Sequence, residues 1–136
     1  MVRSICKDTF LLSRKAEPAV RGDEAVGQDL LDTLAAHSSE CIGMAANMIG
    51  VNKAIIVVSA GPMDVLMYNP VITKKTGPYE AEEGCLSLTG TRKTTRYQQI
   101  EVEFQNASWK KMKQAFSGLT AEIIQHEVDH LQGVLI

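Results

Sequence analysis

The stretch LTAEIIQHEVDHLQG, residues 119–133, decides how this sequence is interpreted. Thr120 is a natural N-cap near its start and Gly133 is a natural stop, so we predict a helix that begins after Gly118. The strand-like segments that precede it are expected to form a mostly antiparallel sheet around this helix. The predicted fold class is therefore α+β, with this helix at its centre.

A metal-binding site on this helix is predicted from QHEVDH, residues 125–130. His126 and His130 are four residues apart, so their imidazoles project from one helix face and can bind one metal ion. Glu127 can reach a metal-bound water as a general base. The alternative is two histidines that fall at this spacing by chance, since the pattern has only three defined positions. Two of the chain's three histidines belong to it, which favours the metal.

A catalytic metal usually has a third protein ligand, with one position left for water. The sequence ends six residues after His130, so we expect this ligand upstream. The candidates are Cys6, Cys41, Cys85, His37 and several carboxylates. Cys85 stands out in EAEEGCLS, and a thiolate suits iron, zinc, nickel or cobalt. Its alternative is a buried structural cysteine.

Other segments supply the rest of the predicted fold. Residues 23–38 read as an amphipathic helix, with Val26, Leu30, Leu34 and His37 at helical spacing. CIGMAANMIG, residues 41–50, reads as a loop. The predicted strands are 54–59, buried on both faces; 64–70, ended by Asn69-Pro70; 98–104, with Ile100, Val102 and Phe104 on one face; and a less regular one around 109–116.

The composition limits the function classes. The 136 residues fit one domain, 1–136, and 45% hydrophobic with 22% charged residues is ordinary for a globular protein. A net charge of -2 gives no reason to expect nucleic acid as a partner. No apolar run approaches the roughly 20 residues of a membrane span, and charge at Lys7 and Asp8 argues against a secretory signal. Three cysteines argue against a disulfide framework and favour the cytoplasm.

Three motifs carry a resemblance to a known family. EGCLS at 83–87 and QHEVDHL at 125–131 resemble the second and third signature motifs of peptide deformylases, and CIGMAANM at 41–48 resembles an altered first motif, GxGxAAxQ. Their order and spacing match, as do MYNP at 67–70 and Arg92, seven residues after Cys85. The resemblance runs from about Val2 to the C-terminus, and the joint presence of EGCLS and HExDH is far more specific than HExxH alone.

The resemblance implies a metal-dependent hydrolase. Cys85, His126 and His130 would bind one divalent metal, commonly ferrous iron, with zinc, nickel or cobalt as alternatives. Metal-bound hydroxide would attack the formyl group on the N-terminal methionine of a nascent peptide, near the ribosome. Glu127 would take the water's proton and pass it to the leaving amine, and the backbone N–H of Leu86 would hold the developing oxyanion. We expect a cytoplasmic monomer.

The resemblance also implies a substrate-binding set. Its members are Cys41, Ile42, Gly43, Met44, Glu83, Gly84, Arg92, Glu122 and Ile123. Gly43 would let the substrate backbone approach closely because it lacks a Cβ atom. Arg92 has an alternative as a solvated cation at a strand end.

Three positions depart from the family pattern. Cys41 replaces a glycine, and Met48 replaces a glutamine whose amide donates to the substrate oxygen. Losing one such donor typically costs about 10²–10³ in kcat, although Asn47 would substitute for it if the loop shifted register. Glu122 stands where the methionine pocket is apolar; its alternative is a solvent-exposed place in the first helical turn.

These departures leave other functions open. One is a deformylase-like paralogue with weak activity or a different N-acyl substrate. Another is a non-catalytic binder of peptide N-termini, but an intact Glu127 beside intact ligands favours hydrolysis. A general HExxH endopeptidase is disfavoured, because EGCLS is the wrong partner motif.

Overall fold

The computed structural model describes residues 1–39, 41–85 and 87–134. Along the chain the elements are α1 (Thr9–Leu12), α2 (Glu24–Ala36), β1 (Gly43–Ala45), the 3-10 helix η1 (Ala46–Ile49), β2 (Ile55–Ala60), β3 (Met63–Cys85), β4 (Leu88–Gln105), β5 (Lys111–Ser117) and α3 (Gly118–Leu131). The strands form an antiparallel sheet in the order β1-β2-β3-β4-β5. The predicted α+β class is confirmed.

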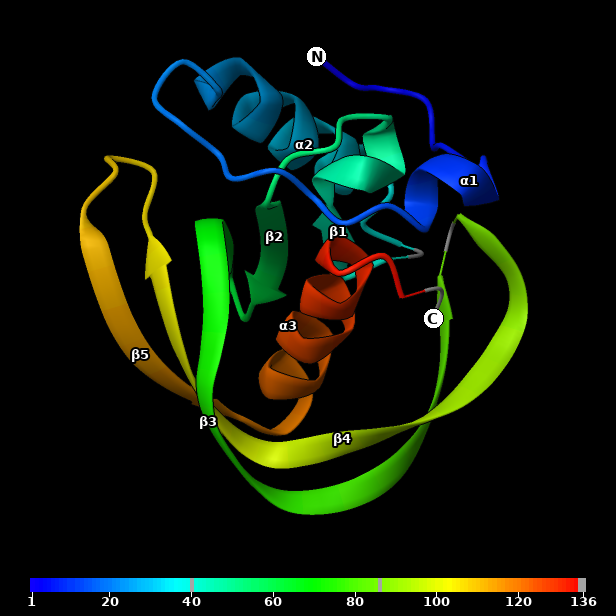
Figure 1. The fold of residues 1–136 in the computed structure, drawn as a ribbon, viewed down its shortest axis with the longest axis vertical. Coiled ribbons are helices and arrows are strands. Elements are labelled where there is room, and N and C mark those ends of the chain that lie inside the picture. Colours follow the sequence, from blue (N-terminus) through cyan, green and yellow to red (C-terminus); the bar gives the residue numbers. More distant parts are fainter. Residues whose placement is uncertain (40, 86, 135–136) are drawn as a thin grey trace.

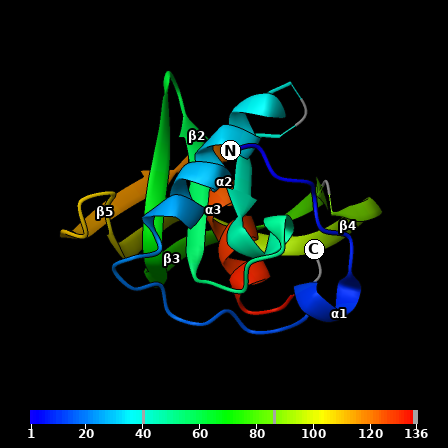
Figure 2. The same cartoon turned by 90° about the horizontal axis from the view of Figure 1, so that it is seen from above.

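The sheet bends around the last helix. Figure 1 shows β3 and β4 as long curved ribbons that pass around α3, with α2 near the top of the view. Helix α3 contacts β1, β2 and β4, while α2 contacts β2. Figure 2 shows the same arrangement from above, with α1 at the edge of the molecule; α1 contacts η1. Strands β1, β2 and β4 therefore pack around α3, the helix that carries the two histidines.

The core confirms the predicted apolar faces. Residues 55–58 of β2 are completely buried, as expected for a strand covered on both faces. Ile100, Val102 and Phe104 of β4 are also buried, on the single face that their alternation predicted. Burial of each such side chain contributes about 1.5–3 kcal/mol. The packing of β2 and β4 against α3 therefore stabilises the frame that holds the site.

Two long strands differ from the prediction. Strand β3 continues through Asn69-Pro70 to Cys85, and β4 begins at Leu88 rather than at residue 98. Asn69 has a positive φ of 53°, and the register with β4 shifts between Tyr68 and Val71, so a bulge accommodates the proline. The Asn69 side chain also bonds the backbone of Ala19 through both of its polar atoms.

The first motif and the last helix also differ in detail. Residues 41–50 are not a plain loop, because they contain β1 and η1. Helix α3 has Ser117 as its N-cap, without a side-chain capping bond, so the prediction for Thr120 was wrong. The stop at Gly133 is confirmed: its φ of 80° is a left-handed conformation that ends a helix.

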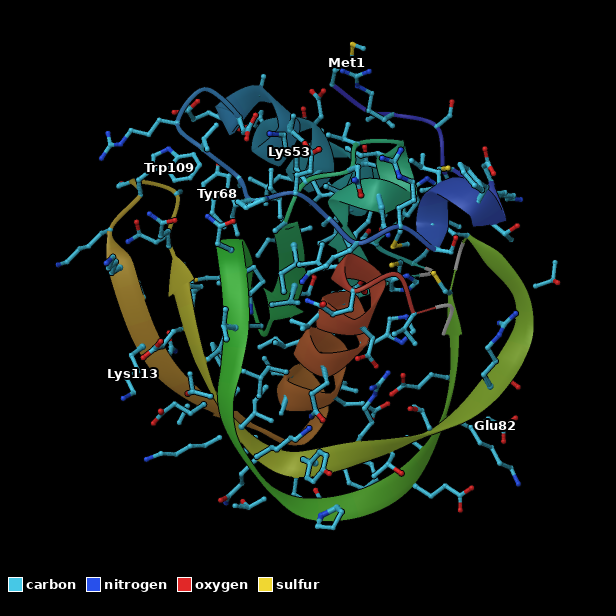
Figure 3. The ribbon with its side chains drawn as sticks, in the orientation of Figure 1. Met1, Lys53, Tyr68, Glu82, Trp109 and Lys113 are labelled. Carbon is cyan, nitrogen blue, oxygen red and sulfur yellow. The ribbon has the colours of Figure 1, made fainter. Side chains whose placement is uncertain are left out.

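An aromatic contact anchors α2 to the sheet. Figure 3 shows Tyr68 and Trp109 side by side, and their rings stack with centroids 3.9 Å apart. The Trp109 Nε1–H donates to Glu24 at the start of α2, with a donor–acceptor distance of 3.1 Å. No helix in the described ranges is long and apolar enough to cross a membrane.

Candidate metal centre and active-site cavity

Three predicted ligands meet at the end of β3 and on one face of α3. The ligand atoms of Cys85, His126 and His130 all lie within 4.8 Å of one another. The two Nε2 atoms are 3.0 Å apart, as the four-residue helical spacing predicts. Among the cysteine candidates in the described part of the chain, Cys85 is the one that joins this group.

The chemistry of this group fits a divalent metal. Burial lowers the pKa of His126, but hydrogen bonds with Cys85 and Glu83 outweigh it and raise the pKa to about 10. Burial and the positive charge at His126 lower the pKa of His130 to about 3. One proton can therefore be held between these rings, but not two. A divalent cation would satisfy both Nε2 lone pairs and a Cys85 thiolate at once.

A buried ion-pair network orients His126. Its Nδ1 lies 2.7 Å from a Glu83 carboxylate oxygen, so Nδ1–H donates and Nε2 faces the other ligands. Arg96 donates to Glu83 through Nε and Nη2, at 2.9 and 2.7 Å, and through Nη1 to Asp129 at 2.6 Å. Burial would raise the pKa of Glu83, but the bonds from His126 and Arg96 lower it to about 2.

Sequence analysis missed Arg96 and Asp129. Arg96 is 13 residues from Glu83 and 33 residues from Asp129 along the chain. Only the pairing of β3 with β4, and the packing of α3 on β4, bring the three together. The one available signal was the position of Asp129 one residue before a predicted ligand on the same helix.

Glu127 has the environment of a general base. Its side chain is buried, and Oε1 has no hydrogen-bond partner within residues 1–39, 41–85 and 87–134. Burial raises the pKa of its carboxyl group to about 7. A pKa near neutrality allows the group to take up and release a proton at physiological pH.

Cys85, His126 and Glu127 border a cavity of about 500 Å³. Its walls come from the residues around β1, the end of β3 and the exposed side of α3. They are Cys41, Ile42, Gly43, Met48, Glu82, Glu83, Gly84, Cys85, Gly90, Leu119, Glu122, Ile123, His126 and Glu127. Most of the predicted substrate-binding residues therefore line the same cavity as Cys85 and His126.

Two of the predicted substrate-binding residues lie outside the cavity lining. Met44 is fully buried in the core instead. Arg92 is half-buried outside the lining, and its guanidinium donates to the Thr89 carbonyl at 3.4 Å. This agrees with its alternative as a strand-end cation. Leu86 lies outside the described residues, so its backbone N–H stays a prediction.

Gly43 is required by the packing of β1 on α3. A Cβ atom at this position would collide with Cγ2 of Ile123 and lie 3.1 Å from Oε2 of Glu127. The absent side chain therefore lets β1 approach the catalytic helix, in addition to any room it leaves for a substrate.

The altered end of the first motif offers no side-chain donor to the cavity. Met48 lines the cavity, and its Sδ accepts from the Ala45 N–H at 3.4 Å. Asn47 is buried outside the lining, and its Nδ2 donates to the His130 carbonyl at 2.9 Å. The hypothesis that Asn47 replaces the missing glutamine is therefore contradicted.

The other two departures lie in the cavity wall. Glu122 is half-buried, and its Oε1 accepts from the Tyr79 hydroxyl at 2.9 Å, which contradicts a purely solvent-exposed role. Burial raises the pKa of this carboxyl group. Cys41 bonds the Gly43 carbonyl through Sγ at 2.6 Å, and it is not part of the ligand group.

Comparisons with known proteins agree with this site. The family model for polypeptide deformylase matches residues 3–136. A peptide deformylase of Clostridium beijerinckii is 52% identical over 136 residues and covers both chains completely. Peptide deformylase 3 of Shewanella oneidensis is 36% identical, over 90% of this chain and 78% of its own length.

Solved structures show the same fold. An actinonin-bound class I type b peptide deformylase from Acinetobacter baumannii aligns with a TM-score of 0.89 at 26% identity, over 99% of this chain and 95% of that one. The peptide deformylase of Thermotoga maritima aligns with a TM-score of 0.89 at 28% identity and the same coverage of both chains. The sequence motifs, the ligand geometry and these matches agree, and the chain belongs to the polypeptide deformylase family.

Proposed function

We propose that this enzyme is a metal-dependent hydrolase that removes the formyl group from the N-terminal methionine of nascent peptides in the cytoplasm. The observation that carries the proposal is the buried Glu127 carboxyl group on the same cavity as Cys85 and His126, whose ligand atoms converge with that of His130. A class I type b peptide deformylase with Met-Ala-Ser bound aligns over 99% of this chain at 26% identity, which supports a peptide substrate. Residues 1–136 act as one domain in a monomer that works near the ribosome.

Cys85, His126 and His130 would hold the metal. Ferrous iron is our proposal in the cell, and zinc, nickel and cobalt are alternatives that a thiolate and two imidazoles also accept. Such an ion supplies a Lewis acid that polarises a carbonyl group and lowers the pKa of a water molecule. Glu83 holds the His126 ring in the tautomer that leaves Nε2 available.

Glu127 moves the proton. Its carboxylate removes a proton from the attacking water and then delivers it to the amide nitrogen of the substrate. The C–N bond breaks, and the products are formate and a peptide with a free N-terminal amine. The buried position of Glu127 keeps bulk water from competing for its oxygens.

The sheet edge at β1 suits an extended peptide. Strand β1 pairs with β2 and stands at the end of the described strand order. Its outer backbone groups can therefore bond a peptide as an added strand. Ile42 and Gly43 border the cavity at this edge, and Cys41 adds a side chain where the family motif has glycine.

Oxyanion stabilisation is the weaker part of the site. We propose that the Leu86 backbone N–H donates to the carbonyl oxygen as negative charge develops. Met48 has no donor to add, so the rate of the chemical step is expected to be reduced.

A second candidate is a paralogue that acts slowly or on another N-acyl substrate. Met48 and Glu122 favour it, because one removes a donor and the other places a carboxyl group in the cavity wall. A non-catalytic binder has less support, because it has no need of Glu127.

Formate release tests the proposal. The protein is loaded with Fe²⁺ without oxygen, since a thiolate-bound ferrous site is prone to oxidation, or with Ni²⁺ in a parallel sample. Formyl-Met-Ala-Ser should yield formate, and acetyl-Met-Ala-Ser should not be hydrolysed at a comparable rate. Equal rates on both peptides would support a different N-acyl substrate, and no release with either metal would contradict the proposal.

A further inference from the structure

Asn47 of η1 has an unusual side-chain environment. Its side chain is fully buried, and Nδ2 donates to the backbone carbonyl of His130 at 2.9 Å. The other end of the amide, Oδ1, accepts no hydrogen bond from any described residue. Buried acceptors without a partner are rare in folded proteins, so this oxygen calls for a donor.

A matching donor lies on the residue that Asn47 already contacts. His130 is fully buried, and its Nδ1 has no hydrogen-bond partner in the described part of the chain. Its Nε2 faces Nε2 of His126 and belongs to the ligand group. When Nε2 binds a metal, the neutral imidazole carries its hydrogen on Nδ1, which becomes a buried donor.

We propose that Asn47 is a positioning residue for the metal ligand His130. Nδ2 holds the helix carbonyl, and Oδ1 accepts from the His130 Nδ1–H, directly or through one buried water, when a metal is bound. His126 has the equivalent support from Glu83, which accepts from its Nδ1. Nδ1 of each predicted ligand imidazole then has a hydrogen-bond acceptor.

An amide suits this position better than a carboxylate. The His130 carbonyl also accepts from the Gly133 N–H at 3.0 Å, where α3 ends, and a second donor there must come from an N–H group. A carboxylate could accept from Nδ1–H but would face the carbonyl oxygen without a proton to donate. It would also add a buried charge, whereas Glu83 has Arg96 to compensate it.

The test measures Co²⁺ binding, which does not depend on whether the protein hydrolyses formyl peptides. The dissociation constant is obtained by competition with a chelator, the Co²⁺ absorption spectrum reports the ligand geometry, and urea unfolding without metal reports stability. Asn47→Ala should weaken Co²⁺ binding about 10- to 100-fold and alter the spectrum. Asn47→Asp, which keeps the acceptor, should bind Co²⁺ within a few fold of wild type although it is less stable without metal.

Asn52→Ala is the matched control. Asn52 also donates through Nδ2 to a backbone carbonyl, but that carbonyl belongs to Lys15 rather than to a predicted ligand, and its Oδ1 also has no partner among the described residues. Its Co²⁺ affinity should equal that of wild type. The proposal is overturned if Asn47→Ala binds Co²⁺ within twofold of wild type with the same spectrum, or if Asn47→Asp loses as much affinity as Asn47→Ala. The Asn47→Asp comparison with wild type decides the question if Asn47→Ala does not fold.

Discussion

The Nε2 atoms of His126 and His130 lie 3.0 Å apart on consecutive turns of α3. At this distance the two rings can share one proton, and a divalent cation would take its place and bind both nitrogens. We therefore expect the group that they form with Cys85, whose ligand atoms lie within 4.8 Å of one another, to be more stable with a metal than without one.

Removal of the metal should lower the stability of the protein. A metal at 100 times its dissociation constant stabilises the native state by about 2.7 kcal/mol, so a chelator should lower Tm by several degrees. His130→Ala should abolish this response, because it removes one ligand. Differential scanning calorimetry with and without chelator measures this change in Tm. His37→Ala, which changes the histidine outside the group, should respond to the chelator like wild type. If both variants lost the response to the chelator equally, the result would argue against the site.

Glu127→Gln should remove catalysis and leave the metal bound. The amide has nearly the same shape as the carboxylate but cannot take the proton of the attacking water, so kcat should fall about 10²- to 10⁴-fold. Formate release measures the rate, and competition with a chelator measures the Co²⁺ affinity of the site. A parallel loss of metal affinity would instead assign Glu127 to holding the ligands in place.

Met48→Gln should increase the rate. A glutamine amide at this cavity position adds the missing donor, and kcat should rise by about 10²-fold or more with a smaller change in KM. Met48→Leu is the control, since leucine has a similar volume and no donor. If both variants have the wild-type rate, the charge at the carbonyl oxygen is stabilised without residue 48.

Glu122 should affect the choice of the first substrate side chain. Glu122→Ile replaces the carboxyl group in the cavity wall with an apolar side chain, so kcat/KM for formyl-Met-Ala-Ser should rise about tenfold relative to formyl-Lys-Ala-Ser. Tyr79→Phe removes the hydroxyl that donates to the Glu122 carboxyl group at 2.9 Å, so it tests whether this hydrogen bond affects the substrate ratio. An unchanged ratio in Glu122→Ile would place the substrate side chain elsewhere.

Arg96→Met should destabilise the protein strongly. It leaves the buried Glu83 carboxylate without its bidentate partner, which typically costs about 3–5 kcal/mol. The double variant Arg96→Met with Glu83→Gln should lose less stability, because it no longer has the uncompensated charge of the Glu83 carboxylate. Urea unfolding measures both. Arg92→Met, four residues earlier on the same strand and half-buried, should change stability by less than about 0.5 kcal/mol.

Local sequence was sufficient for the catalytic helix and for the alternating face of β4. The spacing of His126 and His130 is a property of any α-helix, and the burial of Ile100, Val102 and Phe104 follows from the period of a strand. The family could be identified for a similar reason, since EGCLS and QHEVDHL are contiguous motifs.

The bulge at Asn69 and the position of Asn47 could not be predicted in this way. A proline after Asn69 usually ends a strand, and only the pairing of β3 with β4 shows that the ladder resumes at Val71. The side chain of Asn47 turns towards His130, 83 residues away in sequence, rather than into the cavity.

Sequence alone determined the family and the helix that carries the two predicted ligands and the predicted general base, because these depend on contiguous motifs and on spacings within one turn of backbone. Tertiary structure decided that Cys85 lies beside the two histidines, that Arg96 neutralises Glu83, and that Glu122 lines the cavity. Each of these depends on the register of β3 with β4 and on the packing of α3 against them. Such contacts join residues far apart in the chain, and no local spacing specifies them.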